Sequence, residues 1–173
     1  MRKIYLFPTE REALPFRRLV PEAEIVISGV GMAATAASVA HVVAECATRD
    51  TLIILAGIAG AYGDMALCSV CEVASEYCVE LPERFREHHT ATFCTELLPT
   101  VASNTVHSSG AEAAGADIEN MEGAALYAIA ERLGLRATQI RAISNRVGDA
   151  KELWRIDEAA ATLACELVKI NNL

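Results

Sequence analysis

Aromatic side chains are scarce in this sequence. They make up 5% of the 173 residues, with a single tryptophan, whereas hydrophobic residues in total reach 53%. Ala, Val, Ile and Leu must therefore fill most of the protein core. A chain of this length can bury a sizeable core, so the simplest expectation is one domain over residues 1–173.

Positive charge is also in short supply. The sequence has 15 Lys and Arg against 23 Asp and Glu, which gives a formal net charge of −8. This balance argues against nucleic acid or an anionic membrane as the main partner, because both repel an acidic surface. A small, weakly charged molecule is easier to accommodate.

Long apolar runs are missing as well. No segment approaches the roughly 18 to 20 apolar residues that a membrane-spanning helix needs. The first residues, Met1-Arg2-Lys3, lead into a strand-length run rather than the apolar core of a signal peptide. We therefore expect a cytoplasmic protein with no membrane partner.

The cysteines show neither a disulfide pattern nor a metal pattern. Cys68-Ser69-Val70-Cys71 is a lone C-x-x-C, with no second pair and no His at ligand spacing. It lies at the start of an expected strand, where Cys68 and Cys71 would point to opposite faces. We predict reduced cysteines that fill the core, and neither a metal nor a cofactor. The other cysteines are Cys46, Cys78, Cys94 and Cys165.

Strand-like and helix-like segments alternate along the chain. The pattern predicts strands at 4–7, 25–28, 52–56 and 138–143, and helices at 32–46, 124–133 and 157–170. The region from about 71 to 106 indicates further strands around a charged surface excursion at 80–89. Buried strands separated by helices predict a three-layer α/β fold, with a mostly parallel or mixed central sheet and helices on both faces.

Glycine-rich turns are expected after the second and third strands. These are Gly29-Val30-Gly31 and Gly57-Ile58-Ala59-Gly60. Small residues at such junctions let backbone N–H groups approach an anion or a sugar hydroxyl. Ordinary tight connections are the alternative, because the first turn lacks the third glycine of a dinucleotide fingerprint.

Two polar motifs are the strongest functional signals. Asn120-Met121-Glu122-Gly123 opens an expected helix, and Arg141-Ala142-Ile143-Ser144-Asn145 ends the following strand. In an open α/β sheet these two points fall on one edge, where ligands bind. The alternatives are a helix-capping role for Glu122, a loop-capping role for Ser144-Asn145 and a structural ion pair for Arg141.

These motifs resemble the nucleoside phosphorylase/nucleosidase superfamily, which includes methylthioadenosine/S-adenosylhomocysteine nucleosidase, purine nucleoside phosphorylases and futalosine hydrolase. The resemblance runs from Lys3 to about Val168 and is strongest to futalosine hydrolase of menaquinone synthesis. It is carried by the two motifs, Trp154 and residues 57–61. It implies a shortened nucleosidase of this fold that acts on a small nucleoside and forms a homodimer or a larger homo-oligomer.

The resemblance also assigns roles to individual residues. Glu122 would clamp the ribose hydroxyls, with Met121 packed on the sugar, and Glu12 would position or deprotonate the attacking water. Glu12 also has the spacing of a capping box with Thr9, which is its competing role. The remaining residues of the implied substrate site are Gly31, Gly57, Ile58, Ala59, Asn120, Ser144 and Trp154.

Departures from the pattern indicate the type of base and the nucleophile. Nucleosidases of adenosine thioethers have acidic residues where this chain has Asn120 and Asn145. An asparagine at 145 can donate to N7 or O6 of a 6-oxopurine, which favours hypoxanthine or guanine over adenine. Phosphorolytic relatives have an arginine and a hydroxyl residue where this chain has Leu55 and Ile58, so water is the expected nucleophile.

The short segments 16–24 and 109–119 leave the activity open. They give little room for the extra strand pair of full-length nucleosidases or for the aromatic residue that stacks on the base. Ala113 occupies the approximate place of that aromatic, and Trp154 could replace it, close the site as a lid or anchor the core. Three hypotheses remain from the sequence: a hydrolase of 6-oxopurine nucleosides such as futalosine, a phosphorylase, and a catalytically silent nucleoside-binding module.

Overall fold

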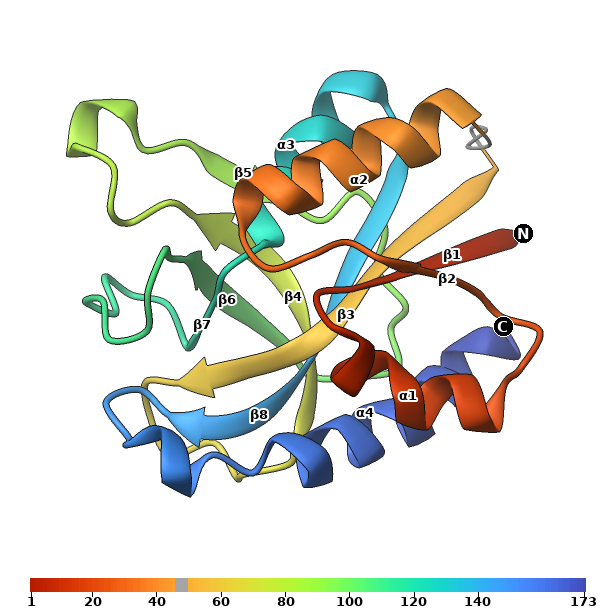
Figure 1. The fold of residues 1–173 in the computed structure, drawn as a ribbon. Helices are drawn as coiled ribbons and strands as arrows, with labels where there is room; N and C mark the ends of the chain where they lie inside the picture. Colours follow the sequence, from red (N-terminus) through yellow and green to blue (C-terminus); the bar gives the residue numbers. More distant parts are fainter. Residues whose placement is uncertain (46–49) are drawn as a thin grey trace.

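The structure is a computed structural model that describes residues 1–45 and 50–173. Eight strands form one sheet, and helices cover both of its faces (Figure 1). The strands are β1 (Arg2–Phe7), β2 (Glu24–Ile27), β3 (Thr51–Ala61), β4 (Val70–Tyr77), β5 (His88–Thr90), β6 (Thr100–Thr105), β7 (Ile118–Asn120) and β8 (Arg136–Arg146). The helices are α1 (Glu10–Leu19), α2 (Met32–Glu45), α3 (Gly123–Leu133) and α4 (Ile156–Asn171), with short 3-10 turns at Glu83–Phe85 and Lys151–Leu153.

The helices lie in two layers. Figure 1 shows α2 and α3 above the sheet and α1 and α4 below it. Each layer has its own apolar core: Leu126 and Tyr127 of α3 belong to one buried cluster, and Phe16 of α1 and Leu163 of α4 belong to the other. The predicted three-layer α/β architecture is confirmed.

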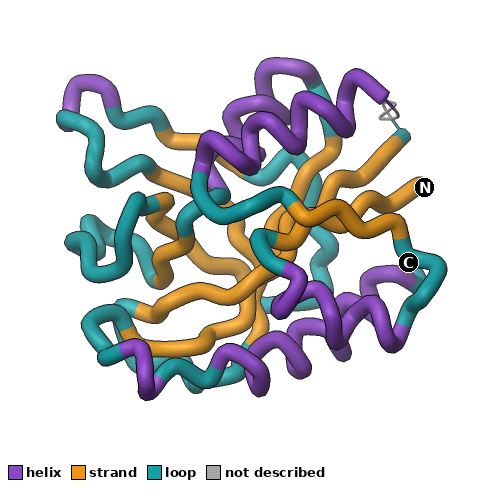
Figure 2. The backbone as a smooth tube through the Cα atoms, viewed as in Figure 1, coloured by secondary structure: helices purple, strands orange, loops and turns teal. Residues whose placement is uncertain are grey.

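The sheet is mixed and partly closed on itself. Strands β1, β2, β3 and β8 pair in parallel, as do β4, β6 and β7. The two sets join antiparallel through β4–β8 and β3–β7, so that β3, β8, β4, β6 and β7 form a ring. Figure 2 shows these strands curling around the centre of the molecule (Figure 2). The curvature brings the ends of distant strands to one edge.

The helix ends follow the sequence signals. Thr9 Oγ1 accepts the N–H of Glu12 at 3.3 Å, which caps α1 as the Thr-x-x-Glu spacing predicts. Gly134 ends α3 in the left-handed region, at φ 63°, where glycine is favoured. No helix in the described part of the chain is long and apolar enough to cross a membrane.

The expected turn at Gly57-Ile58-Ala59-Gly60 is wrong. Strand β3 continues to Ala61, because residues 57–61 pair with β8, and Gly60 and Ala61 also pair with β7. A register shift between Ala59 and Gly60 marks a bulge instead of a turn. The first glycine turn is confirmed, with Gly29 at φ 81° and Gly31 at φ 93°.

The prediction that cysteines fill the core is mostly wrong. Of the described cysteines, all of which are free, Cys71 is buried, Cys68 and Cys78 are half-buried, and Cys94 and Cys165 are exposed. The exposed pair lie in a connecting segment and on the outer side of α4, which a composition argument cannot locate. Cys68 and Cys71 pack in different apolar clusters, but not through strand alternation, because Cys68 lies in the turn before β4 at φ 65°. Cys46 lies outside the described residues.

Candidate active site

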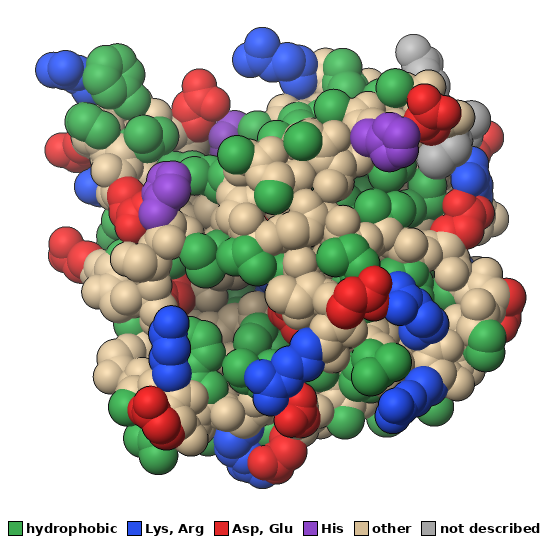
Figure 3. All heavy atoms as spheres, in the orientation of Figure 1, with side chains coloured by type: hydrophobic (Ala, Val, Ile, Leu, Met, Phe, Trp, Pro, Cys, Tyr) green, Lys and Arg blue, Asp and Glu red, His purple; other side chains and the backbone are tan. Residues whose placement is uncertain are grey.

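A cavity of about 190 Å³ opens where the parallel strands end. It lies at the carboxyl ends of β1, β6, β7 and β8 and against residues 58–60 of β3, the edge at which α/β sheets bind ligands. Figure 3 shows a hollow on this face of the molecule, bordered by hydrophobic side chains (Figure 3). The lining residues are Pro8, Thr9, Glu12, Val30, Ile58, Ala59, Gly60, Val106, Ser109, Glu119, Asn120, Met121, Glu122, Ser144, Asn145 and Trp154.

The structure brings together the site residues predicted from the sequence. All of them line the cavity except Gly31 and Gly57, which lie directly behind it. Gly31 N–H donates to Glu122 Oε1 at 3.1 Å. Gly57 adjoins Glu12: a Cβ atom added there would lie 3.0 Å from Glu12 Oε1. Their roles in binding and catalysis stay predictions.

Glu12 reaches the cavity from the first turn of α1. Its Oε1 accepts the N–H of Ile58 at 3.0 Å, and its Oε2 accepts the hydroxyl of Thr9 at 2.6 Å. Burial raises the pKa of the Glu12 carboxyl above its ordinary value, and these two donors offset only part of that rise. A carboxyl poised in this way can hold or accept a proton, which a general base requires.

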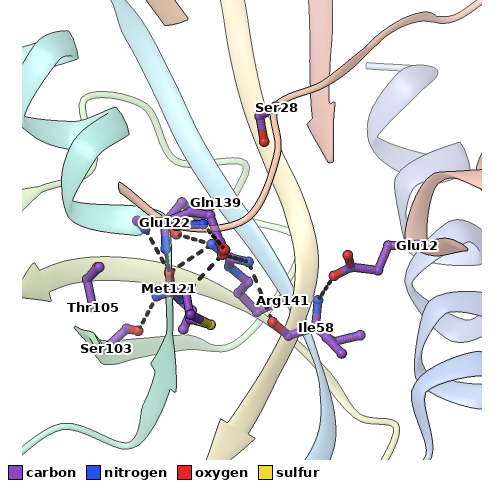
Figure 4. A network of polar contacts seen from close by, with 12 residues as sticks. Glu12, Ser28, Ile58, Ser103, Thr105, Met121, Glu122, Gln139 and Arg141 are labelled. Atoms are coloured by element: carbon purple, nitrogen blue, oxygen red, sulfur yellow. Dashed lines mark hydrogen bonds and ion pairs between the residues drawn. The ribbon is translucent and has the colours of Figure 1, made fainter. Parts of the chain in front are cut away.

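Glu122 forms a buried ion pair with Arg141. The Glu122 carboxylate is 5% exposed and lies 3.3 Å from Arg141 Nη1, whose side chain has no exposed surface. Met121 N–H donates to the same carboxylate at 3.3 Å. Figure 4 shows Arg141 extending from β8 toward Glu122, with Ile58 and Glu12 on its other side (Figure 4). The ion pair, which the sequence left open as one alternative for Arg141, is present.

Asn120 occupies the junction of β7 and α3. Its Oδ1 accepts the N–H groups of Glu122 at 2.8 Å and Gly123 at 2.7 Å, and Arg141 Nη2 at 2.9 Å. Its Nδ2 donates to Ser103 and to the buried carboxylate of Glu76. Asn120 therefore faces the cavity, while its amide is engaged by the protein.

The space in front of Gly57 lies between a carboxylate and a guanidinium. A Cβ at this position would stand 2.8 Å from Arg141 Nη1 and 3.0 Å from Glu12 Oε1. Any side chain would push at least one of these groups away, because real Cβ contacts are not this short. Glycine at 57 allows both groups to approach the same point.

Asn145 and Ser144 form the opposite end of the cavity. Ser144 Oγ donates to Asn145 Oδ1 at 2.7 Å, and Asn145 Nδ2 donates to Arg146 O at 3.0 Å. This leaves one N–H of Asn145 without a protein acceptor among the described residues. Trp154 completes this end, with its indole N–H donating to Asp149 O at 3.2 Å, and it belongs to neither apolar cluster.

Two buried carboxylates at or directly behind the cavity were missed from the sequence. Glu119, on β7, accepts hydrogen bonds from Tyr62 and Ser109 and lines the cavity. Glu76, on β4, is fully buried behind Asn120, and burial raises the pKa of its carboxyl. For Glu76 the available signal was a charged residue inside a region expected to form strands, but it could not show which way the side chain points. For Glu119 there was no such signal, because no strand was expected at 118–120.

The cavity is acidic and has no cationic lining. Among the described residues that line it there is neither Lys nor Arg, whereas Glu12, Glu119 and Glu122 all reach it. Leu55, the expected counterpart of a phosphate-binding arginine, is fully buried in an apolar cluster. Over residues 1–45 and 50–173, no group of three or more His, Cys, Asp or Glu side chains could hold a metal ion.

Sequence and structure comparisons agree with this geometry. The family model described as "Phosphorylase superfamily" matches residues 62–170, more than half of the chain. The chain belongs to the phosphorylase superfamily. No curated protein matches it significantly in sequence.

Solved structures with the phosphorylase-superfamily fold superpose on nearly the whole chain. A Helicobacter pylori 5′-methylthioadenosine/S-adenosylhomocysteine nucleosidase with a bound inhibitor has a TM-score of 0.85 at 12% identity, covering 100% of this chain and 99% of its own. A Helicobacter pylori futalosine hydrolase mutant gives 0.84 at 12% identity, covering 100% of both chains. Arabidopsis thaliana 5′-methylthioadenosine nucleosidase gives 0.81 at 18% identity, covering 98% of this chain and 94% of its own. Identities this low show a shared fold alone.

Proposed function

We propose that this protein hydrolyses the N-glycosidic bond of a purine nucleoside, with a 6-oxopurine nucleoside such as futalosine as the preferred substrate and hypoxanthine as the released base. The observation that carries the proposal is the convergence of Glu12, Glu122 and Asn145 on one cavity. The resemblance of the motifs to futalosine hydrolase and the nucleosidase neighbours in fold support the same class of reaction.

The sugar would lie against Glu122. Its carboxylate is fixed by Gly31 N–H, Met121 N–H and Arg141, and it retains lone pairs that can accept the ribose hydroxyls. Met121 lines the cavity beside it. A ribose held there would place its anomeric carbon between Glu12 and the base.

The base would lie against Asn145. Ser144 engages the Asn145 carbonyl and Arg146 O accepts one of its N–H groups, so the second N–H would be the group that meets the base. An N–H donor matches O6 of a 6-oxopurine, whereas the 6-amino group of adenine would face it donor to donor. The cost of such a mismatch is about 1–3 kcal/mol, enough to rank one base above the other.

Water would be the nucleophile. The phosphate dianion needs cationic or multiple donor groups, and the cavity lining supplies carboxylates instead. Glu12 would accept a proton from the water, while Glu122 holds the sugar as positive charge develops on it and Asn145 stabilises the departing base. The catalysis is then electrostatic and positional, with no covalent intermediate.

Self-association is part of the proposal. The resemblance implies a homodimer or a larger homo-oligomer, and α2 turns a line of small apolar residues outward: Ala33, Ala37, Ala40 and Ala44, all exposed. Figure 3 shows hydrophobic side chains gathered over this helix. Light scattering after size-exclusion chromatography should give at least twice the 18.5 kDa chain mass, and Ala37→Glu should lower it. A monomer would end this part of the proposal.

Base release from futalosine, inosine, guanosine and methylthioadenosine, with and without phosphate, tests the activity. We expect hypoxanthine release that does not depend on phosphate, and slow release from methylthioadenosine. Release that requires phosphate would identify a phosphorylase. No release from any of these nucleosides by folded protein would favour a nucleoside-binding module.

A further inference from the structure

Glu76 is a fully buried carboxylate that does not reach the cavity. It lies on β4 with no exposed surface. Every side chain that bonds to it presents a hydrogen: Thr105 Oγ1 at 2.8 Å, Gln139 Nε2 at 3.2 Å, and Asn120 Nδ2. Because an ionised carboxylate only accepts hydrogen bonds, these donors favour the anion of Glu76 and offset part of the rise that burial causes in its pKa.

Glu76 fixes the orientation of the Asn120 amide. The nitrogen end of that amide faces Glu76, so the oxygen end must face the opposite way, toward Glu122 N–H, Gly123 N–H and Arg141 Nη2. A flipped amide would place its NH₂ against three donors and its oxygen against a carboxylate. Both errors leave buried groups unpaired, at about 1–3 kcal/mol each.

The first residues of α3 pack directly against the Glu76 carboxylate. A Cβ on Gly123 would lie only 2.1 Å from Glu76 Oε1, so a larger residue cannot stand there while Glu76 holds its place. Thr105 Oγ1 accepts the N–H of Ala124 at 2.8 Å and donates to Glu76. An anion is favourable at the first turn of a helix, because the free N–H groups there carry partial positive charge.

Resting on the proposed function, we propose that Glu76 is a positioning residue for the ribose clamp, acting through Asn120. Asn120 holds both partners of the clamp at once: the backbone of Glu122 and the guanidinium of Arg141. Glu76 thereby sets the direction in which the Glu122 carboxylate faces the ribose hydroxyls, although no atom of Glu76 touches the substrate.

The test compares a ribonucleoside with its 2′-deoxy form. If Glu76 acts through the clamp, Glu76→Gln should lower kcat/KM for inosine by about tenfold and for 2′-deoxyinosine by no more than about twofold. The ratio of the two substrates should then approach that of Glu122→Gln. Adding Glu76→Gln to the Glu122→Gln variant should have little further effect, because both changes remove one interaction.

Exchange of the paired groups provides a rescue. Asn120→Asp alone should also lose activity toward inosine, because it places a second carboxylate against Glu76. The double variant Glu76→Gln with Asn120→Asp restores one carboxylate and one amide across the same contact. We expect it to recover the inosine to 2′-deoxyinosine ratio to within about threefold of the parent.

Glu72→Gln is the matched control. Glu72 precedes Glu76 on β4 and is also fully buried. Its carboxylate bonds to Thr95 and Thr138, away from the clamp. This change should lower stability and leave the substrate ratio unchanged. An equal loss for both nucleosides in Glu76→Gln, or no recovery in the exchanged double variant, would overturn the proposal.

Binding separates this proposal from the proposed hydrolysis. Calorimetric titration of Glu12→Gln protein with inosine and 2′-deoxyinosine needs no turnover. A preference for inosine that Glu76→Gln removes would support the positioning role even if the parent releases no base. A preference for inosine that survives Glu76→Gln, or no preference at all, would contradict it.

Discussion

Strands β3 and β8 lie side by side at the centre of the sheet, but they contribute different kinds of residue to the site. Both are eleven residues long, both are almost entirely buried, and they pair in parallel. The cavity half of β3 carries only small or aliphatic residues, whereas β8 carries Gln139, Arg141, Ser144 and Asn145, all buried. One strand supplies space and backbone groups, and the other supplies side-chain chemistry.

The register of the two strands shows why the division works. Gly57 stands opposite Arg141, and Gly60 stands opposite Asn145. At each position a Cβ on the glycine would approach the polar group, to 2.8 Å from Arg141 Nη1 and 3.0 Å from Asn145 Nδ2. The glycines of β3 are therefore required by their neighbours on β8, rather than by a turn.

Removal of the buried cation on β8 should have the largest effect. Arg141→Met leaves Glu122, Asn120 and Gln139 without their shared donor, and breaking a buried ion pair typically costs about 3–5 kcal/mol. We expect that loss in the free energy of unfolding by urea, and a fall in kcat/KM of at least about a hundredfold.

Arg136→Met is the control for this change. Arg136 is exposed at the beginning of the same strand, so its replacement should alter stability by less than about 0.5 kcal/mol. If both variants unfold at the same urea concentration, the central role of Arg141 is wrong.

Glu12→Gln should separate activity from stability. Burial raises the pKa of Glu12 in the folded state above its pKa in the unfolded chain. The folded state therefore loses stability as pH rises from the unfolded pKa to the folded pKa, and this loss remains at higher pH. The variant should lose about a hundredfold or more in turnover, yet gain stability over the parent at neutral pH, with the gain fading in acid.

Parent activity should likewise fall as pH drops through the raised pKa of Glu12, because a protonated carboxyl cannot accept a proton from water. Urea unfolding and base release measured across the acid range check both statements. Glu10→Gln, exposed on the same helix, should show neither effect. Glu12→Gln protein that is less stable than the parent at every pH would contradict the desolvation argument.

The two glycines of β3 should differ in their effects. Gly57→Ala crowds Arg141 and Glu12 and should lower kcat by about tenfold for every nucleoside. Gly60→Ala crowds Asn145 and should act mainly on the ranking of bases. Steady-state kinetics with inosine and adenosine distinguish the two. Identical profiles would mean that the glycines provide general room only.

Ile58→Thr should have the smallest effect. It adds a hydroxyl to the cavity wall, but no Lys or Arg is among the described residues that line the cavity, and Leu55 is buried in the apolar cluster. The rate of base release should change by less than about threefold and remain independent of phosphate. Phosphate-stimulated release in this variant would show that the site is closer to a phosphorylase than its acidic lining indicates.

The sequence predicted the parts of the site that lie in local motifs. Asn120, Glu122 and Asn145 stand at element ends that periodicity and capping signals can locate, and the structure brings all three to one cavity. The strands at 4–7 and 138–143 and the helices at 124–133 and 157–170 were also found, because burial and helical spacing repeat locally.

Long-range pairing accounts for what the sequence did not predict. Gly57 and Gly60 indicate a turn by their own preferences, and pairing with β8, joined at Gly60 by pairing with β7, keeps them in a strand. Glu76 reaches Asn120 across 44 residues through the β4–β6–β7 pairings, which no local pattern encodes. Tertiary contacts therefore determine both the strand conformation of the two glycines and the position of Glu76.

The base preference of Asn145→Asp tests the account most directly. For the parent, kcat/KM should be higher with inosine than with adenosine, because the Asn145 amide donates to a 6-oxopurine. An aspartate at this position can accept from the 6-amino group and protonate N7, so the preference should shift toward adenosine by at least about tenfold. An unchanged ranking of the two nucleosides would mean that Asn145 does not contact the base, and the assignment of the site would fail.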